Sequence, residues 1–164
     1  MSFRSFVRAR FVTADAVYGT ILYSALIAGI SDDNESALEV LLISAFSLLV
    51  FWGAHVFAGT VATHGVRDGV QIPLRAAALS ALSHSIGMLY AAILPSVALV
   101  LGAVNLVSTD DAVTLALLVA TVILGILGYQ AFAQRRSPVI IRILGGIGTA
   151  LFGFLMIALN VIVH

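Results

Sequence analysis

The chain has 164 residues, of which 61% are hydrophobic and only 10% are charged, and its mean hydropathy is +1.12. Soluble domains carry roughly 25% charged residues, so this composition excludes an ordinary soluble fold. Cysteine is absent, which excludes disulfides, thiolate metal sites and a cysteine nucleophile. We therefore expect an all-α, polytopic membrane helix bundle that forms a single domain over residues 1–164.

Five apolar segments have the length needed to cross a membrane, which is about 20 helical residues for roughly 30 Å of hydrocarbon. The predicted spans are residues 11–30, 38–62, 74–103, 112–132 and 139–163. The first segment carries Asp15 and continues to Ile30, so it is interpreted as a retained helix and not as a cleaved signal peptide. Ser36 and Ser108 precede acidic residues and are predicted helix N-caps, and Pro73 is placed at a helix start.

The charges are sorted between the two ends of these segments. Every basic residue is an arginine. They are Arg4, Arg8 and Arg10 before the first span, Arg67 and Arg75 around the second loop, and Arg135, Arg136 and Arg142 around the fourth. The other two loops carry only acids, such as Asp32 and Asp110. The positive-inside rule then predicts five crossings of the inner (plasma) membrane, with the N-terminus inside and the C-terminus outside.

Three ionisable residues, Asp15, His55 and His84, fall within the predicted spans. Ionisable side chains in hydrocarbon are costly and are functional candidates. At a rise of 1.5 Å per residue, their distances from the neighbouring loops place all three residues at about the same depth in an antiparallel bundle. The polar neighbours of this layer are Tyr18, Thr20 and Trp52. The layer either clamps helices together, supports an ion or proton pathway, or binds haem or a metal.

The metal alternative has little support, because no His-x-x-x-His or Glu-x-x-His pair is present, and neither a metal nor a cofactor is expected. Phosphate-binding glycine loops and a Ser-His-Asp signature are missing, so no enzyme is predicted. The basic residues are sparse and lie next to the spans, so nucleic acid is not expected as a partner.

Small residues recur at four-residue spacing in the last two spans. The two rows are Thr121 and Gly125, and Gly145, Thr149 and Gly153. Small residues let helix backbones approach closely in a membrane, where lipid gives no hydrophobic drive. The rows indicate packing within the chain or the seam of a homo-oligomer.

Three sequence pieces resemble a known family. They are Asp15-Ala-Val-Tyr-Gly-Thr-Ile21, Phe51-Trp-Gly-Ala-His55 and Pro95-Ser-Val-Ala-Leu-Val-Leu-Gly102. In this order they resemble the first three helices of the endolysosomal and bacterial potassium channels marked by a Phe-Ser-Asp motif. The resemblance implies scaffold roles for Asp15, Trp52 and His55, and places Thr20 and Ile21 near a pore constriction. The chain departs from that pattern, because Thr13-Ala14 replaces Phe-Ser and five spans replace six.

Together these features predict a small bacterial membrane protein that gives a monovalent cation or a proton a passive pathway, as a homo-oligomer in the lipid bilayer. The alternative, from another class, is a non-catalytic membrane scaffold or accessory subunit that packs through its glycine-rich helices. A haem- or metal-binding membrane protein is the third hypothesis.

Overall fold

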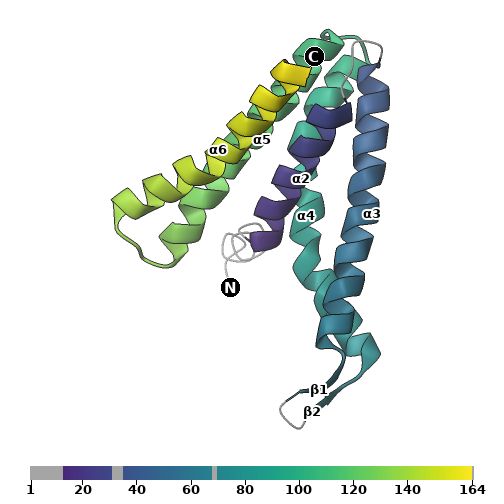
Figure 1. The fold of residues 1–164 in the computed structure, drawn as a ribbon, viewed down its shortest axis with the longest axis vertical. Helices are drawn as coiled ribbons and strands as arrows, with labels where there is room; N and C mark the ends of the chain where they lie inside the picture. Colours follow the sequence, from purple (N-terminus) through teal and green to yellow (C-terminus); the bar gives the residue numbers. More distant parts are fainter. Residues whose placement is uncertain (1–12, 31–34, 68–69, 164) are drawn as a thin grey trace.

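The computed structural model describes residues 13–30, 35–67 and 70–163. Within these residues the chain forms five helices and one short β-hairpin (Figure 1). In order they are α2 (Ala14–Ile30), α3 (Ala37–Thr63), β1 (Gly65–Arg67), β2 (Val70–Ile72), α4 (Leu74–Ala103), α5 (Thr109–Gln134) and α6 (Val139–Val163). The predicted all-α fold is confirmed.

Four of these helices, α3 to α6, are long and apolar enough to cross a membrane. Helix α2 is a shorter apolar helix of 17 residues. The predicted start of this span, residues 11 and 12, lies outside the described residues. The described helix begins at Ala14, and Thr13 caps it: the Thr13 hydroxyl accepts a hydrogen bond from the Ala16 N–H at 3.1 Å. The class defined by the described helices is therefore a multi-pass α-helical membrane protein.

The predicted caps fix the starts of the later helices. Ser36 and Glu39 form a reciprocal capping box, in which the Ser36 hydroxyl accepts from the Glu39 N–H and the Glu39 carboxylate accepts from the Ser36 N–H at 2.8 Å. The Ser108 hydroxyl accepts from the Asp111 N–H at 3.1 Å and starts α5. Pro73 is the N-cap residue of α4. Each side-chain cap satisfies an N–H group that has no partner within its helix.

The loop predicted between the second and third spans is an antiparallel β-hairpin. Its strands pair Gly65 with Ile72, Val66 with Gln71 and Arg67 with Val70. Gly65 has a φ of 115°, a conformation that favours glycine, and His64 Nδ1 lies 3.1 Å from the Ile72 carbonyl oxygen. The prediction of a plain loop was therefore incomplete, because three-residue strands are too short to show an alternating pattern.

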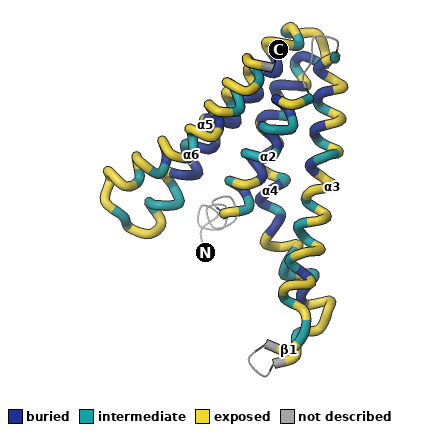
Figure 2. Tube along the Cα trace, viewed as in Figure 1, coloured by how far each residue is buried: buried dark blue, intermediate teal, exposed yellow. Residues whose placement is uncertain are grey.

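The helices form two arms that diverge from a common end (Figure 1). Helices α3 and α4 form one arm and α5 and α6 form the other. Helix α2 contacts all four of them. Burial is concentrated where the arms meet, and the diverging ends are mostly exposed (Figure 2). Large side chains fill the core at this junction, among them Tyr23, Ile27, Val40, Leu48, Met88, Leu99 and Leu117.

Glycines bring the backbones together at the junction. A Cβ on Gly19 of α2 would lie 2.6 Å from the Met88 Cα of α4. A Cβ on Gly102 would lie 2.6 Å from the Ala112 Cβ and 2.7 Å from the Ala37 Cβ. The end of α4 therefore packs directly on the first turns of α3 and α5. Only glycine permits contacts this close without displacement of a neighbouring helix.

Candidate functional site

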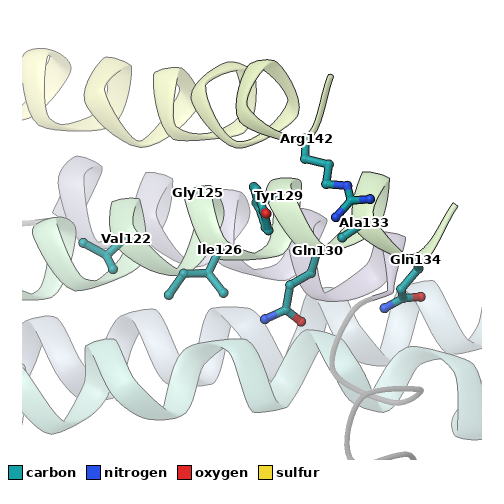
Figure 3. A pocket seen from close by; sticks show the side chains of 8 residues that line it. All are labelled: Val122, Gly125, Ile126, Tyr129, Gln130, Ala133, Gln134 and Arg142. Atoms are coloured by element: carbon teal, nitrogen blue, oxygen red, sulfur yellow. The ribbon is translucent and has the colours of Figure 1, made fainter. Parts of the chain in front are cut away.

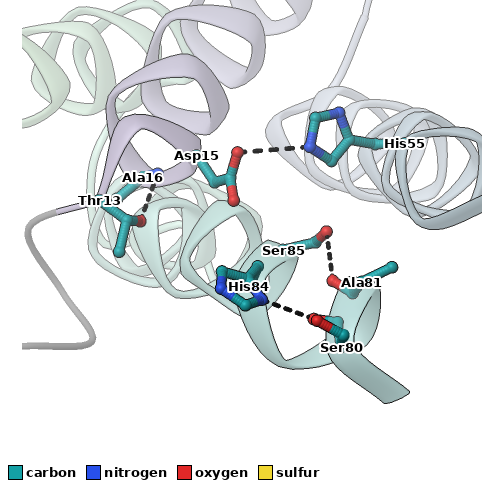
Figure 4. A network of polar contacts seen from close by, with 8 residues as sticks. All are labelled: Thr13, Asp15, Ala16, His55, Ser80, Ala81, His84 and Ser85. Carbon is teal, nitrogen blue, oxygen red and sulfur yellow. Dashed lines mark hydrogen bonds and ion pairs between the residues drawn. The ribbon is translucent and has the colours of Figure 1, made fainter. Parts of the chain in front are cut away.

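The structure brings Asp15 and His55 together across two helices. Asp15 lies in the first turn of α2, and its Oδ1 is 3.3 Å from Nε2 of His55 on α3 (Figure 4). The contact is an ion pair when the imidazole is protonated. The side chains are 24% and 41% exposed, so the pair lies at the surface of the bundle and not in its core. The Tyr18 ring stacks on His55, with a centroid distance of 6.0 Å and an interplanar angle of 25°.

His84 lies at the same level on α4. One turn further along, a Cβ on Gly87 would contact Thr13 and Ala16 of α2, so His84 lies beside the first turn of that helix (Figure 4). His84 is exposed, and its Nδ1 is 2.7 Å from the Ser80 carbonyl oxygen. Because a carbonyl can only accept, Nδ1 carries the proton in this contact. No described ion pair joins His84 to Asp15.

We name Asp15, Tyr18, His55 and His84 the polar layer. Asp15 is fifteen residues from Ile30 at the end of α2, and His55 is eighteen residues from Ala37 at the start of α3. These offsets correspond to about 22 and about 27 Å along the helices. The polar layer therefore lies toward the hairpin end of the molecule.

Three further candidates lie along the same helices and differ in burial. Trp52, one turn before His55, packs against the core, and its Nε1 is buried without a hydrogen-bond partner among the described residues. Thr20 is fully buried, and its hydroxyl donates to the Ala16 carbonyl at 2.8 Å. Ile21 is half-buried. Thr20 is enclosed within the single chain, so a pore-lining role would require rearrangement of α2. That role stays a prediction.

A second polar contact between helices was not anticipated from the sequence. The Tyr23 hydroxyl of α2 lies 2.7 Å from the Ser96 hydroxyl of α4, and the Ser44 hydroxyl of α3 donates to Tyr23 at 3.4 Å. Tyr23 and Ser44 are buried. The available signal was a tyrosine within an apolar span, because a buried tyrosine hydroxyl usually finds a partner.

The predicted small residues lie on the facing sides of α5 and α6. The Thr149 hydroxyl of α6 donates to the Leu124 carbonyl of α5 at 2.7 Å. A Cβ on Gly153 would overlap Thr121. A Cβ on Gly125 would touch Ala150 at 3.7 Å, and one on Gly145 would overlap Phe132. The two rows therefore form a seam within one chain.

Within the described residues, no group of three or more His, Cys, Asp or Glu side chains is placed to hold a metal ion. Comparison of the chain with protein-family models, with curated proteins and with solved structures found no match. The potassium-channel resemblance stays a prediction that rests on the three sequence pieces.

Proposed function

We propose that α2 to α6 cross the plasma membrane of a bacterial cell five times, with the arginine-rich ends in the cytoplasm. The charge distribution supports this orientation, because the described arginines lie at the hairpin and at the α5–α6 turn, whereas Asp110 and Asp111 lie at the opposite end of α5. The C-terminus is then outside.

Within that topology, we propose that the protein gives a monovalent cation or a proton a passive pathway as a homo-oligomer. One observation carries this proposal: the polar layer is open to the surface of the single chain, because His84 and Tyr18 are exposed and the side chains of His55 and Asp15 are 41% and 24% exposed. Charged groups in contact with lipid are costly, so the outward face of the layer needs water or another subunit. A second copy that covers this face would enclose a polar, hydrated space, and Asp15 would attract cations there.

The same contacts also favour a second candidate, the non-catalytic membrane scaffold. The Asp15–His55 pair joins α2 to α3, and the seam holds α6 against α5. In a scaffold these contacts only hold the bundle in shape for a partner protein. The two functions differ in one measurable property, which is ion flux.

The test is flux of K⁺, Na⁺ and H⁺ into proteoliposomes that contain the purified full chain. Asp15→Asn removes the charge with little change in shape, and it should lower the flux at least about tenfold if Asp15 attracts the ion. Asp110→Asn is the matched control, because Asp110 is an exposed acid at the far end of α5. It should leave flux within about twofold of the wild type.

Circular dichroism and size-exclusion chromatography with light scattering establish folding and subunit number for each variant. Flux that depends on Asp15 in a folded oligomer supports the pathway. Flux no greater than in empty liposomes, for all three ions and across pH, rejects the pathway and leaves the scaffold as the function.

A further inference from the structure

A pocket of about 700 Å³ lies beside α5, near the α5–α6 turn (Figure 3). Its walls are Val122, Gly125, Ile126, Tyr129, Gln130, Ala133, Gln134 and Arg142. None of these residues belongs to the polar layer. The lining changes from apolar to polar along α5. Its apolar end is at Val122, and the amides of Gln130 and Gln134 and the guanidinium of Arg142 lie at the end near the turn. Val122 and Gln130 are separated by about 12 Å along the helix.

The turn holds the Arg142 guanidinium in place. The Ser137 N–H donates to the Phe132 carbonyl at 3.3 Å and so closes the end of α5. The Ser137 carbonyl in turn accepts a hydrogen bond from Arg142 Nε at 2.7 Å. Arg142 is half-buried and reaches from α6 toward Ala133 of α5 (Figure 3). A guanidinium fixed through Nε can still present its terminal N–H groups to an anion.

Within the described residues, no carboxylate pairs with the positive charge at this end of the molecule. Arg135 and Arg136 lie in the same turn, and the sequence contains no acid after Asp111. Across the described part of the chain, no arginine forms an ion pair with a carboxylate, and the amides of Gln130 and Gln134 form no hydrogen bond. The pocket therefore combines an unopposed cation, two free amides and an apolar wall.

We propose that this pocket binds an anionic phospholipid. Arg142 would pair with the phosphate, Gln130 and Gln134 would hydrogen-bond the headgroup, and an acyl chain would lie along Ile126 and Val122. Charge complementarity identifies the ligand as anionic, and basic pockets between membrane helices are sites of this kind. The apolar wall distinguishes a lipid from a soluble anion. With the proposed orientation, the lipid comes from the cytoplasmic leaflet.

The test uses the full chain in neutral detergent, with native mass spectrometry and thermal unfolding as readouts. The probes are dioctanoyl phosphatidylglycerol, dioctanoyl phosphatidylcholine and inorganic phosphate. The wild type should bind the phosphatidylglycerol at least about tenfold more tightly than the phosphatidylcholine. Arg142→Gln should weaken that binding about tenfold, since a charge-assisted hydrogen bond is lost.

Arg142→Gln also removes the bond to Ser137, so a second variant is needed. Ile126→Trp leaves the turn intact and fills the apolar part of the pocket, and it should weaken binding by a similar factor. Ile126 is 49% exposed and can accept a larger side chain. Arg135→Gln is the matched control, because Arg135 lies in the same turn but outside the pocket lining, and binding should change by less than about twofold.

Four results would overturn the proposal. Equal affinity for both lipids would show that the pocket does not recognise the negative charge of the headgroup. Equal losses in Arg135→Gln and Arg142→Gln would show diffuse surface attraction. Equal stabilisation by inorganic phosphate would identify a site for a soluble anion. A lipid-free dimer that Ile126→Trp dissociates would show that a second copy occupies the pocket.

Discussion

The hydroxyl of Tyr23 lies 2.7 Å from the hydroxyl of Ser96, which links α2 to α4 inside an otherwise apolar core. Ser44 of α3 donates to the same tyrosine. The Ser44 hydroxyl also lies 3.2 Å from the Leu41 carbonyl oxygen of its own helix. Three helices thus share one polar contact at Tyr23. A directional hydrogen bond restricts the relative rotation of the helices in addition to apolar packing.

Tyr23→Phe should lower the free energy of unfolding by about 1 kcal/mol, in the range found for hydrogen bonds between membrane helices. The ring remains to fill the core, whereas Ser96 loses its partner and Ser44 keeps only its bond to the Leu41 carbonyl. Unfolding by a denaturing detergent, followed by circular dichroism, measures the change. Tyr18→Phe is the control, because Tyr18 is 49% exposed. Equal losses in the two variants would contradict a specific role for the Tyr23 hydroxyl.

The Asp15–His55 contact should show measurable coupling in a double-mutant cycle. Asp15→Asn, His55→Gln and the double variant replace the ionisable groups with amides at little change in volume. We expect a coupling energy of about 0.5–1 kcal/mol, because both side chains are partly exposed and water screens the contact. The readout is the free energy of unfolding in detergent. Additive single effects would show that the two side chains do not interact.

The seam between α5 and α6 should be intolerant of added volume. A Cβ at Gly128 would overlap both Thr149 and the Gly145 carbonyl oxygen, so Gly128→Ala should cost about 1–3 kcal/mol. Gly148→Ala is the control in α6, because a Cβ there meets nothing within 4 Å. This second change should be neutral or stabilising by up to about 1 kcal/mol. Thermal unfolding in detergent measures the stability of both variants. An unchanged stability of Gly128→Ala would contradict close packing of α5 against α6 at this position.

The absence of cysteine makes the orientation directly testable. Single cysteines at Ser36 and at Ser137 should react with a membrane-impermeant maleimide from opposite sides of the membrane. In intact spheroplasts we expect Ser36→Cys to react and Ser137→Cys to react only after permeabilisation. Reaction of both in intact spheroplasts would contradict five crossings.

The positions of the helices could be predicted closely from the sequence, because the signals that mark them lie within a few residues of each helix. Apolar length marks a membrane-length helix, and Ser36, Ser108 and Pro73 mark helix starts through contacts within a few residues. The predicted 112–132 span began three residues late because the first turn of α5 contains Asp110 and Asp111, which lower its hydropathy while favouring its N-terminus. The sequence also predicted that Asp15 and His55 lie at similar depth. The number of residues from each of them to the short loop between the first two spans could be counted directly.

The arrangement of the helices was not predictable by the same means. In a membrane protein the lipid-facing and core-facing sides are both apolar, so hydrophobic periodicity does not identify the buried side. Phe46 is 69% exposed and Leu48 is 3% exposed, although both are large and apolar. The divergence of the two arms, the Tyr23–Ser96 contact and the pocket at Arg142 all depend on helix rotation, which long-range packing decides.

The short length of α2 has a consequence for the surrounding membrane. Its 17 residues cover about 25 Å, whereas the hydrocarbon core is about 30 Å thick. In the proposed topology, in which α2 crosses the membrane, this hydrophobic mismatch would be met by local thinning of the bilayer or by headgroups and water that reach down to Asp15. The mismatch is local to α2, because α3 to α6 have 25 to 30 residues and are long enough to span the full thickness. Acyl-chain length should therefore act on the surroundings of Asp15 and leave the other four helices matched.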